Sequence, residues 1–266
     1  QIEAITNCLN NSIPIITGGP GTGKTTIIKC IIDILEDLKQ EYVLCAPTGR
    51  ASKRITETTG KEAKTIHRLL EITKVDDKDL DTMYNLAVRP VEADVIIIDE
   101  ASMIDCLMMN NLFKAIKPNT KVILVGDIDQ LPSVGPGNVL KDIIDSKVVS
   151  VVSLKEIYRQ SSKSDIILNA HLVNQGKYPK FKNKDTDMFF VKTNSIEDTI
   201  NEISSLLLYR LENFAKLDIL KDLQVLTPMR KTELGSIHLN AKIQNILNPK
   251  SDKKKEKEFG GKIFRE

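Results

Sequence analysis

A glycine-rich stretch that ends in Lys24 and Thr25 is the part of the sequence with the clearest chemistry. Residues 18–26 read Gly-Gly-Pro-Gly-Thr-Gly-Lys-Thr-Thr, which fits the phosphate-binding pattern G-x-x-x-x-G-K-S/T. Glycines let the backbone turn its N–H groups toward a phosphate, and the helix that follows adds the positive end of its dipole. The sequence therefore predicts a site for a nucleoside triphosphate, with Lys24 on the β- and γ-phosphates and the Thr25 hydroxyl on Mg²⁺. The predicted nucleotide-binding residues of this loop are Gly19, Gly21, Thr22, Gly23, Lys24, Thr25 and Thr26.

Two adjacent carboxylates, Asp99 and Glu100, follow the continuously apolar run Val95–Ile98. Such a run is typical of a strand buried on both faces, which argues against an ordinary surface pair of acids. We expect Asp99 to hold Mg²⁺ and Glu100 to orient or deprotonate the attacking water. The pair favours hydrolysis of ATP over transfer of phosphate to another substrate, and no Asn-Lys-x-Asp segment indicates guanine recognition.

A third candidate for the same site is the amide side chain of Gln130, which follows the apolar run Val122–Val125 and Gly126-Asp127. An amide can hydrogen-bond the γ-phosphate or the attacking water without adding charge, so its position can report whether ATP or ADP is bound. Glutamine is also common in ordinary turns, so Gln130 supports a nucleotide site only together with the loop and the acids.

The elements that must position these residues are apolar runs separated by helical patterns. This alternation predicts an α/β fold, a parallel sheet with helices on both faces, and ligands at the carboxyl ends of its strands. The predicted strands are Ile13–Thr17, Tyr42–Ala46, Val95–Ile98, Val122–Val125 and Val148–Val152.

The pattern changes after the first strands. Between Glu71 and Pro90 the periodicity lapses, which indicates a small insertion. A second region begins after Val152, and the mixed-charge run Lys250–Glu258 is predicted to be a solvated loop rather than a nucleic-acid patch. The elements predicted in this region are helices at Asp165–Asn174, Ile196–Phe214 and Ile237–Leu247 and a strand at Leu223–Leu226.

Composition excludes several classes of protein. The 266 residues are 41% apolar and 28% charged, typical of a soluble globular chain of one large or two ordinary domains. No run is long enough to span a membrane and no signal-peptide pattern occurs. Four widely spaced cysteines predict reduced, buried thiols and a cytoplasmic location.

The net charge of the chain is only +2, so a nucleic-acid site would have to be a local patch of basic residues. The sequence does not begin with Met, which predicts that it is a piece of a longer protein.

Further segments occur in an order that one family shares. They are Gln1-x-x-Ala4-Ile5, Ala-Pro-Thr-Gly-Arg-Ala at 46–51, Thr-Ile-His-Arg-Leu-Leu at 65–70, Asp-Glu-Ala-Ser-Met at 99–103, Gly-Asp-x-x-Gln-Leu-Pro at 126–132, Tyr-Arg-Gln at 158–160, and Leu-Thr-Pro-Met-Arg-Lys at 226–231 with Gly235, Leu239 and Asn240. With the phosphate loop, they make nearly the whole chain resemble superfamily 1 DNA helicases. The resemblance is closest to RecD-like helicases, which include the alpha subunit of exodeoxyribonuclease V.

The resemblance implies a P-loop NTPase with two RecA-like motor domains. Residues 1–152 would form the first, with 71–92 as a small pin-like insertion, and 153–266 would form the N-terminal part of an incomplete second domain. Gln1 would bind the adenine, and Arg159 would act as an arginine finger beside the catalytic residues Lys24, Asp99, Glu100 and Gln130. The DNA-binding residues implied are Thr48, Gly49, Arg50, Thr65, His67, Pro132, Thr227, Arg230 and Asn240.

Some of these roles have plainer alternatives. His67 could tie a helix start to the sheet by a structural hydrogen bond, and Arg159 could form an interdomain salt bridge. Arg230 and Lys231 could bind DNA phosphates or only solvate a loop.

The function implied is that of an ATP-dependent DNA helicase or translocase in recombination and repair. It would move 5′-to-3′ on single-stranded DNA and open duplex junctions, with further subunits of an exodeoxyribonuclease V-type complex as potential partners and no membrane. Because the chain ends at Glu266, before the family's last motifs, this 266-residue piece is expected to be a weak ATPase at most. The alternatives are a nucleotide-gated DNA-binding regulatory module and a P-loop ATPase that acts on RNA or protein.

Overall fold

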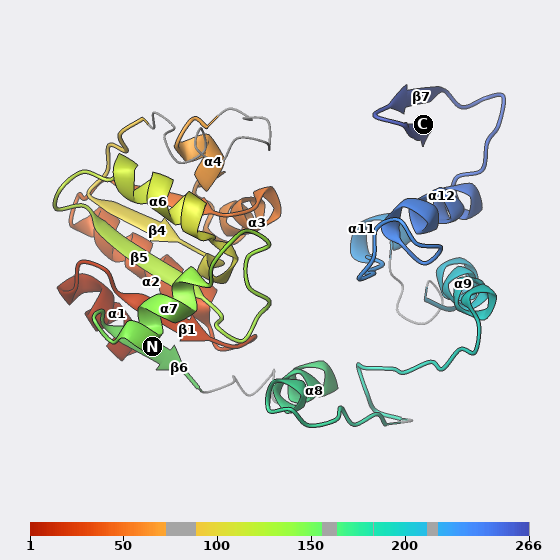
Figure 1. Ribbon diagram of the computed structural model, residues 1–266, viewed down its shortest axis with the longest axis horizontal. Helices are drawn as coiled ribbons and strands as arrows, with labels where there is room; N and C mark the ends of the chain where they lie inside the picture. The colour runs from red at the N-terminus through yellow and green to blue at the C-terminus, as the bar shows by residue number, and fades with distance from the viewer. Residues whose placement is uncertain (73–88, 156–163, 183, 212–217, 266) are drawn as a thin grey trace. The chain divides into compact units, whose positions relative to one another are not determined.

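The computed structural model describes residues 1–72, 89–155, 164–182, 184–211 and 218–265. The chain divides into two compact units, Gln1–Phe189 and Phe190–Glu266, which are described separately (Figure 1). Most of the insertion predicted at 71–92, and Tyr158, Arg159 and Gln160, lie outside the described residues. The division into motor domains after residue 152 therefore stays a prediction.

The first unit is built on a six-stranded sheet in which every neighbouring pair of strands is parallel, as the sequence predicts. The strand order is β3-β2-β4-β5-β1-β6. The strands are β1 (Ile15–Gly18), β2 (Tyr42–Ala46), β3 (Ala63–Thr65), β4 (Val95–Ile98), β5 (Lys121–Gly126) and β6 (Val151–Leu154). The predicted bounds of β2 and β4 are confirmed, whereas β1 and β6 begin later than predicted and β3 was not predicted.

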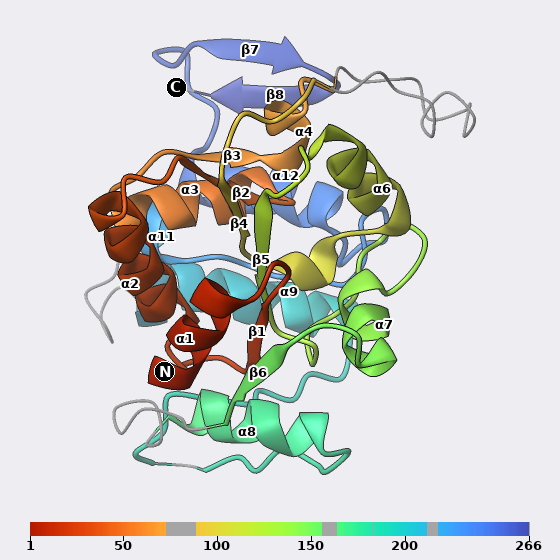
Figure 2. The ribbon, with the colours of Figure 1, turned by 90° about the vertical axis from the view of Figure 1, so that its left-hand side faces the viewer.

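Helices cover both faces of this sheet (Figure 2). On one face α1 (Ile2–Asn10), α2 (Lys24–Asp37) and α3 (Gly49–Thr59) pack against alternate strand residues such as Ile16 and Ile97. On the other, α4 (Ile66–Leu69), α6 (Cys106–Ala115) and α7 (Val139–Ser146) pack against the residues between them, such as Ile15 and Ile96. Successive side chains of a strand point to opposite faces, so each apolar strand serves two cores.

The predicted helix at Asp165–Asn174 is confirmed as α8, the last helix of the first unit. Its start is fixed by Asp187, which accepts hydrogen bonds from the Asp165 N–H at 2.7 Å and the Ser164 hydroxyl at 2.5 Å. Lys182 pairs with the Asp165 carboxylate at 2.6 Å. These local contacts join α8 to the segment that follows it.

The second unit contains helices and one hairpin among its described residues. They are α9 (Ile196–Ser205), the π-helical turn η3 (Leu206–Arg210), α11 (Ile219–Asp222), α12 (Ser236–Leu247), and β7 (Glu256–Phe259) paired antiparallel with β8 (Lys262–Arg265).

Two predictions for this unit are wrong. Residues Leu223–Leu226 do not form a strand, because they pair with no other strand in the described part of the unit. The predicted loop Lys250–Glu258 forms strand from Glu256 onward, where the Arg265 guanidinium binds the Glu256 carboxylate across the hairpin. None of the helices described in either unit has the length and apolar character needed to cross a membrane.

Candidate active site

The phosphate-binding loop connects β1 to α2, as predicted. Gly21 and Gly23 have φ angles of 74° and 89°, a left-handed backbone that side chains other than glycine rarely adopt. A Cβ at Gly18 would lie 2.9 Å from the carbonyl oxygen of Leu154, so only glycine lets the loop start this close to β6. The Lys24 ammonium donates to the carbonyl oxygens of Gly18 at 2.5 Å and Gly19 at 3.1 Å. These contacts hold its charge directly over the loop.

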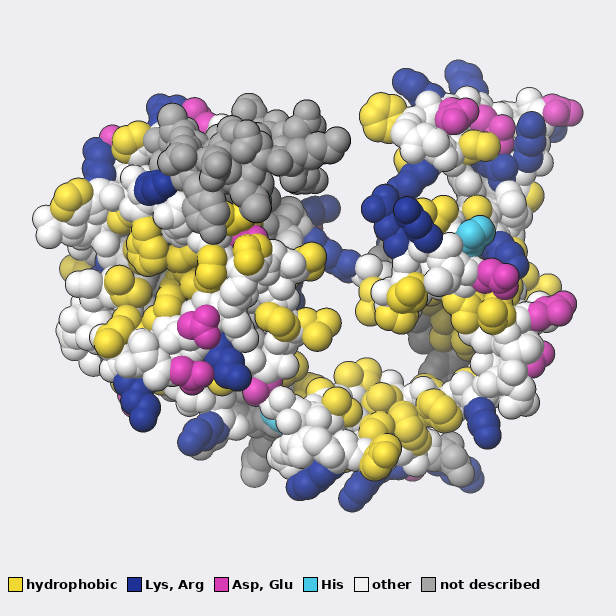
Figure 3. Space-filling model, in the orientation of Figure 1, with side chains coloured by type: hydrophobic (Ala, Val, Ile, Leu, Met, Phe, Trp, Pro, Cys, Tyr) yellow, Lys and Arg dark blue, Asp and Glu magenta, His cyan; other side chains and the backbone are white. Residues whose placement is uncertain are grey.

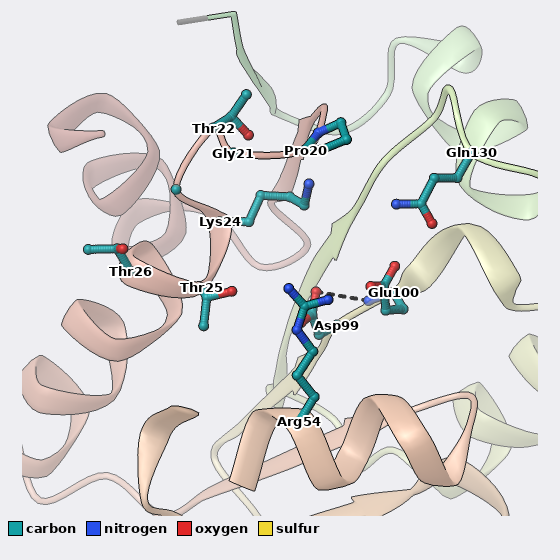
Figure 4. A pocket seen from close by; sticks show the side chains of 11 residues that line it. Pro20, Gly21, Thr22, Lys24, Thr25, Thr26, Arg54, Asp99, Glu100 and Gln130 are labelled. Carbon is teal, nitrogen blue, oxygen red and sulfur yellow. Dashed lines mark hydrogen bonds between the residues drawn. The ribbon is translucent and has the colours of Figure 1, made fainter. Parts of the chain in front are cut away.

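A cavity of about 530 Å³ opens over this loop (Figure 4). This volume lies within the usual range of small-ligand sites, roughly 300–1,000 Å³. The cavity brings together three of the predicted elements, namely the loop, the acid pair and the amide. The residues that line it are Pro20, Gly21, Thr22, Gly23, Lys24, Thr25, Thr26, Arg54, Asp99, Glu100 and Gln130.

The acid pair follows β4 and faces the loop across this cavity (Figure 4). Asp99 Oδ1 accepts a hydrogen bond from the Glu100 N–H at 2.9 Å. Glu100 has φ 54° and ψ 38°, a strained left-handed conformation for a residue with a side chain. Its Oε2 is buried and has no hydrogen-bond partner. A strained backbone that presents an unpaired carboxylate oxygen fits a group whose partner is a ligand or a water molecule.

Burial and the surrounding charges act in opposite directions on the pKa values of Asp99 and Glu100. Burial raises the pKa of Asp99, while the Glu100 N–H and the positive charges of Lys24 and Arg54 lower it. Burial also raises the pKa of Glu100, and the neighbouring Asp99 charge raises it further, against Lys24 and Arg54. Two neighbouring half-buried carboxylates are unfavourable without cations, so the site is suited to receive positive charge.

Gln130 is held over the cavity by the buried residue Asp127, which follows β5 and is 2% exposed. The Gln130 amide donates to Asp127 Oδ2 at 3.4 Å, and its backbone N–H donates to the Asp127 carbonyl oxygen at 3.2 Å. Figure 4 shows the amide directed toward Glu100 and Lys24. This arrangement allows the amide to reach a bound phosphate or its attacking water.

Of the other residues predicted to bind the nucleotide, some face the acid pair and others do not. Figure 4 shows the Thr25 hydroxyl facing Asp99, whereas the Thr26 side chain points away from it. Gln1 is exposed, precedes α1 and does not line the cavity. Arg159 lies outside the described residues.

Sequence reasoning missed two lining residues of the cavity, Pro20 within the loop itself and Arg54 on α3. The available signal for Arg54 was its position one helical turn after Arg50, in a helix that leaves the carboxyl end of a strand. Such spacing places both residues on one side of the helix, but it does not show which way that side faces.

The DNA-facing residues predicted in the first unit lie mainly at the ends of two adjacent strands. Thr48 follows β2 and caps α3 by accepting the Ala51 N–H at 3.2 Å. Thr65 ends β3 and caps α4 by accepting the Arg68 N–H at 3.2 Å. Since Ala46 and Thr65 are partners in the ladder between β2 and β3, the two caps belong to the same edge of the sheet.

The other predicted DNA contacts of this unit are accessible. Gly49, Arg50, His67 and Pro132 are all exposed. They can therefore be reached by a ligand without any change in the fold.

The DNA-facing residues predicted in the second unit surround a tight loop before α12. The Thr227 hydroxyl donates to the Leu234 carbonyl oxygen at 2.7 Å, and Gly235 lies so close to the Arg230 carbonyl that a Cβ would be 2.6 Å from its oxygen. Arg230 and Asn240 are exposed. On the face of this unit shown in Figure 3, Lys and Arg side chains lie near α12 and the hairpin, and at the hairpin they are interspersed with Asp and Glu.

Comparison with protein families matches residues 1–136 to a model described as an AAA domain. The ATP-dependent RecD2 DNA helicase of Deinococcus radiodurans is 35% identical over 249 residues, which are 94% of this chain and 32% of that protein. The RecBCD enzyme subunit RecD of Buchnera aphidicola subsp. Schizaphis graminum is 34% identical over 253 residues, covering 73% of this chain and 41% of that protein. These relatives confirm the resemblance to RecD-like helicases, although the chain spans less than half of either one.

Among solved structures, the Pif1 helicase from Candida albicans aligns with a TM-score of 0.50 at 23% identity. The alignment covers 67% of this chain and 44% of that chain. This likeness concerns the fold, and it agrees with the RecA-like arrangement of parallel strands and flanking helices predicted from the sequence.

Proposed function

The chain belongs to the AAA domain family, and from that membership and its cavity we propose that it is part of an ATP-dependent DNA helicase or translocase of the RecD-like kind. One observation carries the proposal: a single cavity contains a phosphate loop with Lys24, two strand-end carboxylates and the amide of Gln130. A binding module that only senses ATP has no need for Glu100, whose buried Oε2 is unpaired.

ATP would bind with its phosphates on the loop and the Lys24 ammonium. The glycine backbone supplies N–H donors, and Lys24 neutralises charge on the β- and γ-phosphates. Glu100 would accept a proton from the attacking water through its unpaired oxygen, and Gln130 would hold that water or the γ-phosphate by its amide. Together these groups favour hydrolysis.

The residues present suit Mg²⁺. The Thr25 hydroxyl and the Asp99 carboxylate face each other across the cavity, and hard oxygen donors of this kind are the ligands that Mg²⁺ prefers (Figure 4). When bound, the ion supplies charge neutralisation at the phosphates. Its positive charge would also offset the burial that raises the pKa of Asp99.

Single-stranded DNA would lie along the edge formed by Thr48, Gly49, Arg50, Thr65 and His67. Hydroxyl, amide and guanidinium donors hold phosphates without reading the bases, which suits movement along any sequence. The exposed residues Pro132, Arg230 and Asn240 and the half-buried Thr227 are proposed as further contacts. For ATP to drive movement, nucleotide binding must change the DNA affinity of at least one motor domain.

The finer parts of the proposal concern the whole protein. They are an arginine finger at Arg159, adenine recognition by Gln1, and 5′-to-3′ movement. They also include a role in recombination and repair, assembly into an exodeoxyribonuclease V-type complex and a cytoplasmic location. The free cysteines of the chain support the location. The 266 residues alone are proposed to hydrolyse ATP weakly.

The experiment measures ATP hydrolysis by the full-length protein without nucleic acid and with single-stranded DNA or RNA of the same sequence. We expect stimulation by DNA and its loss in Lys24→Ala. A stronger response to RNA would replace the helicase proposal with an RNA-dependent ATPase. ATP binding without hydrolysis under any condition would favour a regulatory module.

A further inference from the structure

Arg54 brings a permanent positive charge from α3 into the nucleotide cavity. Figure 4 shows its guanidinium extending from the helix toward Asp99 and Glu100, and it lines the cavity with them. Its charge lowers the pKa of both acids. A guanidinium is a planar, permanently charged group that can bind a carboxylate with two parallel N–H donors.

The guanidinium is close to the acids without being locked to them. Among the ion pairs of the described residues, none joins Arg54 to Asp99 or Glu100, and Arg54 itself is exposed. The Arg54 side chain can therefore change its distance from the acids without breaking an ion pair.

The same helix carries the proposed single-strand contacts in its first turn. Thr48 is the N-cap of α3, and Gly49 and Arg50 begin it. Arg50 and Arg54 are four residues apart, so they lie on the same side of α3, one turn from each other. The inner side of α3 is fixed to the core by the buried residues Ser52 and Ile55.

We propose that Arg54 is a positioning residue that couples single-stranded DNA at the start of α3 to ATP hydrolysis by orienting the Glu100 carboxylate. DNA phosphates on Thr48, Gly49 and Arg50 fix the first turn of α3, and with it the backbone from which the Arg54 side chain reaches the acids. The guanidinium then holds Glu100 in the orientation that receives a proton from water. This inference rests on the proposed function, because it requires stimulation by DNA.

Two simpler roles make different predictions for Arg54. As a direct ligand of the γ-phosphate, it would affect ATP affinity and the rate without DNA as strongly as the stimulated rate. As a general source of positive charge near the acids, it would be replaced fully by any other cation at the same position.

The test compares Arg54→Gln, Arg54→Lys and the control Lys53→Gln in the full-length protein. Lys53 is next to Arg54 on α3, but its side chain is 78% exposed, pairs with Glu57 and does not line the cavity. The quantities measured are kcat and the KM for ATP, each without DNA and with saturating single-stranded DNA. Fluorescence anisotropy gives the Kd for DNA, and thermal melting checks folding.

In Arg54→Gln we expect the ratio of DNA-stimulated to DNA-free kcat to fall about 10- to 100-fold, the scale of a misplaced catalytic group. The KM for ATP and the Kd for DNA should stay within about 2- to 3-fold of wild type, a difference under ~1 kcal/mol. Arg54→Lys should restore part of the ratio, because it keeps the charge without the planar fork. Lys53→Gln should behave as wild type.

Equal losses with and without DNA, or a large rise in the KM for ATP, would overturn the inference in favour of a direct phosphate contact. An unchanged ratio in Arg54→Gln, or complete rescue in Arg54→Lys, would also overturn it. If Arg54→Gln does not fold, the ratio of DNA-stimulated to DNA-free kcat in Arg54→Lys decides: a ratio below wild type supports the inference, and a wild-type ratio overturns it. Absence of DNA stimulation in the wild type would instead refute the proposed function, and the coupling with it.

Discussion

Replacing Glu100 with glutamine should separate ATP binding from ATP hydrolysis. The substitution keeps the shape of the side chain and removes the carboxylate that we propose as the acceptor of a proton from water. Glu100 Oε2 is buried without a partner, so the amide of Glu100→Gln breaks no hydrogen bond of that atom. The fold and the phosphate loop should remain intact.

The magnitude follows from the role assigned to the carboxylate. A positioned general base contributes about 10²- to 10⁴-fold to a rate, which corresponds to roughly 3–5 kcal/mol of activation free energy. ATP affinity should stay equal or increase, because the lost negative charge stood beside Asp99 and near the phosphates. The Asp99 charge raises the pKa of Glu100, which shows that the two acids repel each other.

Single-turnover hydrolysis of γ-labelled ATP in a quench-flow instrument measures the chemical step, and a fluorescent ATP analogue measures binding. The control is Glu57→Gln, which removes an exposed carboxylate on α3 that pairs with Lys53 at 3.7 Å. A chemical step in Glu100→Gln within about 3-fold of wild type would refute Glu100 as the base. Loss of ATP binding would show instead that the side chain supports the nucleotide site.

Three further predictions concern other parts of the first unit. Burial raises the pKa of Cys45 to about 12, whereas Cys106 is exposed, so a thiol reagent at neutral pH should label Cys106 in the folded protein and Cys45 only after denaturation. Gly18→Ala would place a Cβ 2.9 Å from the Leu154 carbonyl oxygen, and we expect a loss of about 1–3 kcal/mol in unfolding free energy, measured by urea titration. The Lys182 ammonium lowers the pKa of Asp165 below its ordinary value in the folded state. The pair of Asp165 with Lys182 therefore stabilises the folded protein at neutral pH, and this stabilisation is lost as the pH falls through the pKa of Asp165 in the folded state. Thermal melting of Lys182→Gln should show a weaker loss of stability in that acidic range than wild type.

The parts of the fold that could be predicted are those with a strong local signal. Tyr42–Ala46 and Val95–Ile98 are compact apolar runs, and both became strands with the predicted bounds. The strand Ala63–Thr65 has only three residues, one of them a lysine, so it depends on its pairing with β2 rather than on its own pattern. Leu223–Leu226 has an apolar composition but no partner strand among the described residues, and an apolar pattern alone cannot supply one.

The candidate site likewise has a part that the sequence predicts and a part that depends on three-dimensional packing. Lys24, Asp99 and Gln130 were predicted because each follows a strand and belongs to a motif with a known spacing, and one cavity brings them together. The left-handed backbone of Glu100 and the direction of Arg54 were not predicted. Both depend on how β4 and α3 pack in three dimensions, which a local pattern does not contain.

The most direct test of the motor proposal is ATP-driven displacement of streptavidin from single-stranded DNA by the full-length protein. The DNA carries biotin at its 3′ end in one substrate and at its 5′ end in the other. We expect ATP to accelerate displacement from the 3′ end and not from the 5′ end, with no acceleration in Lys24→Ala or with ADP. DNA-stimulated hydrolysis without acceleration at either end would contradict movement along the strand, and acceleration only at the 5′ end would reverse the proposed direction.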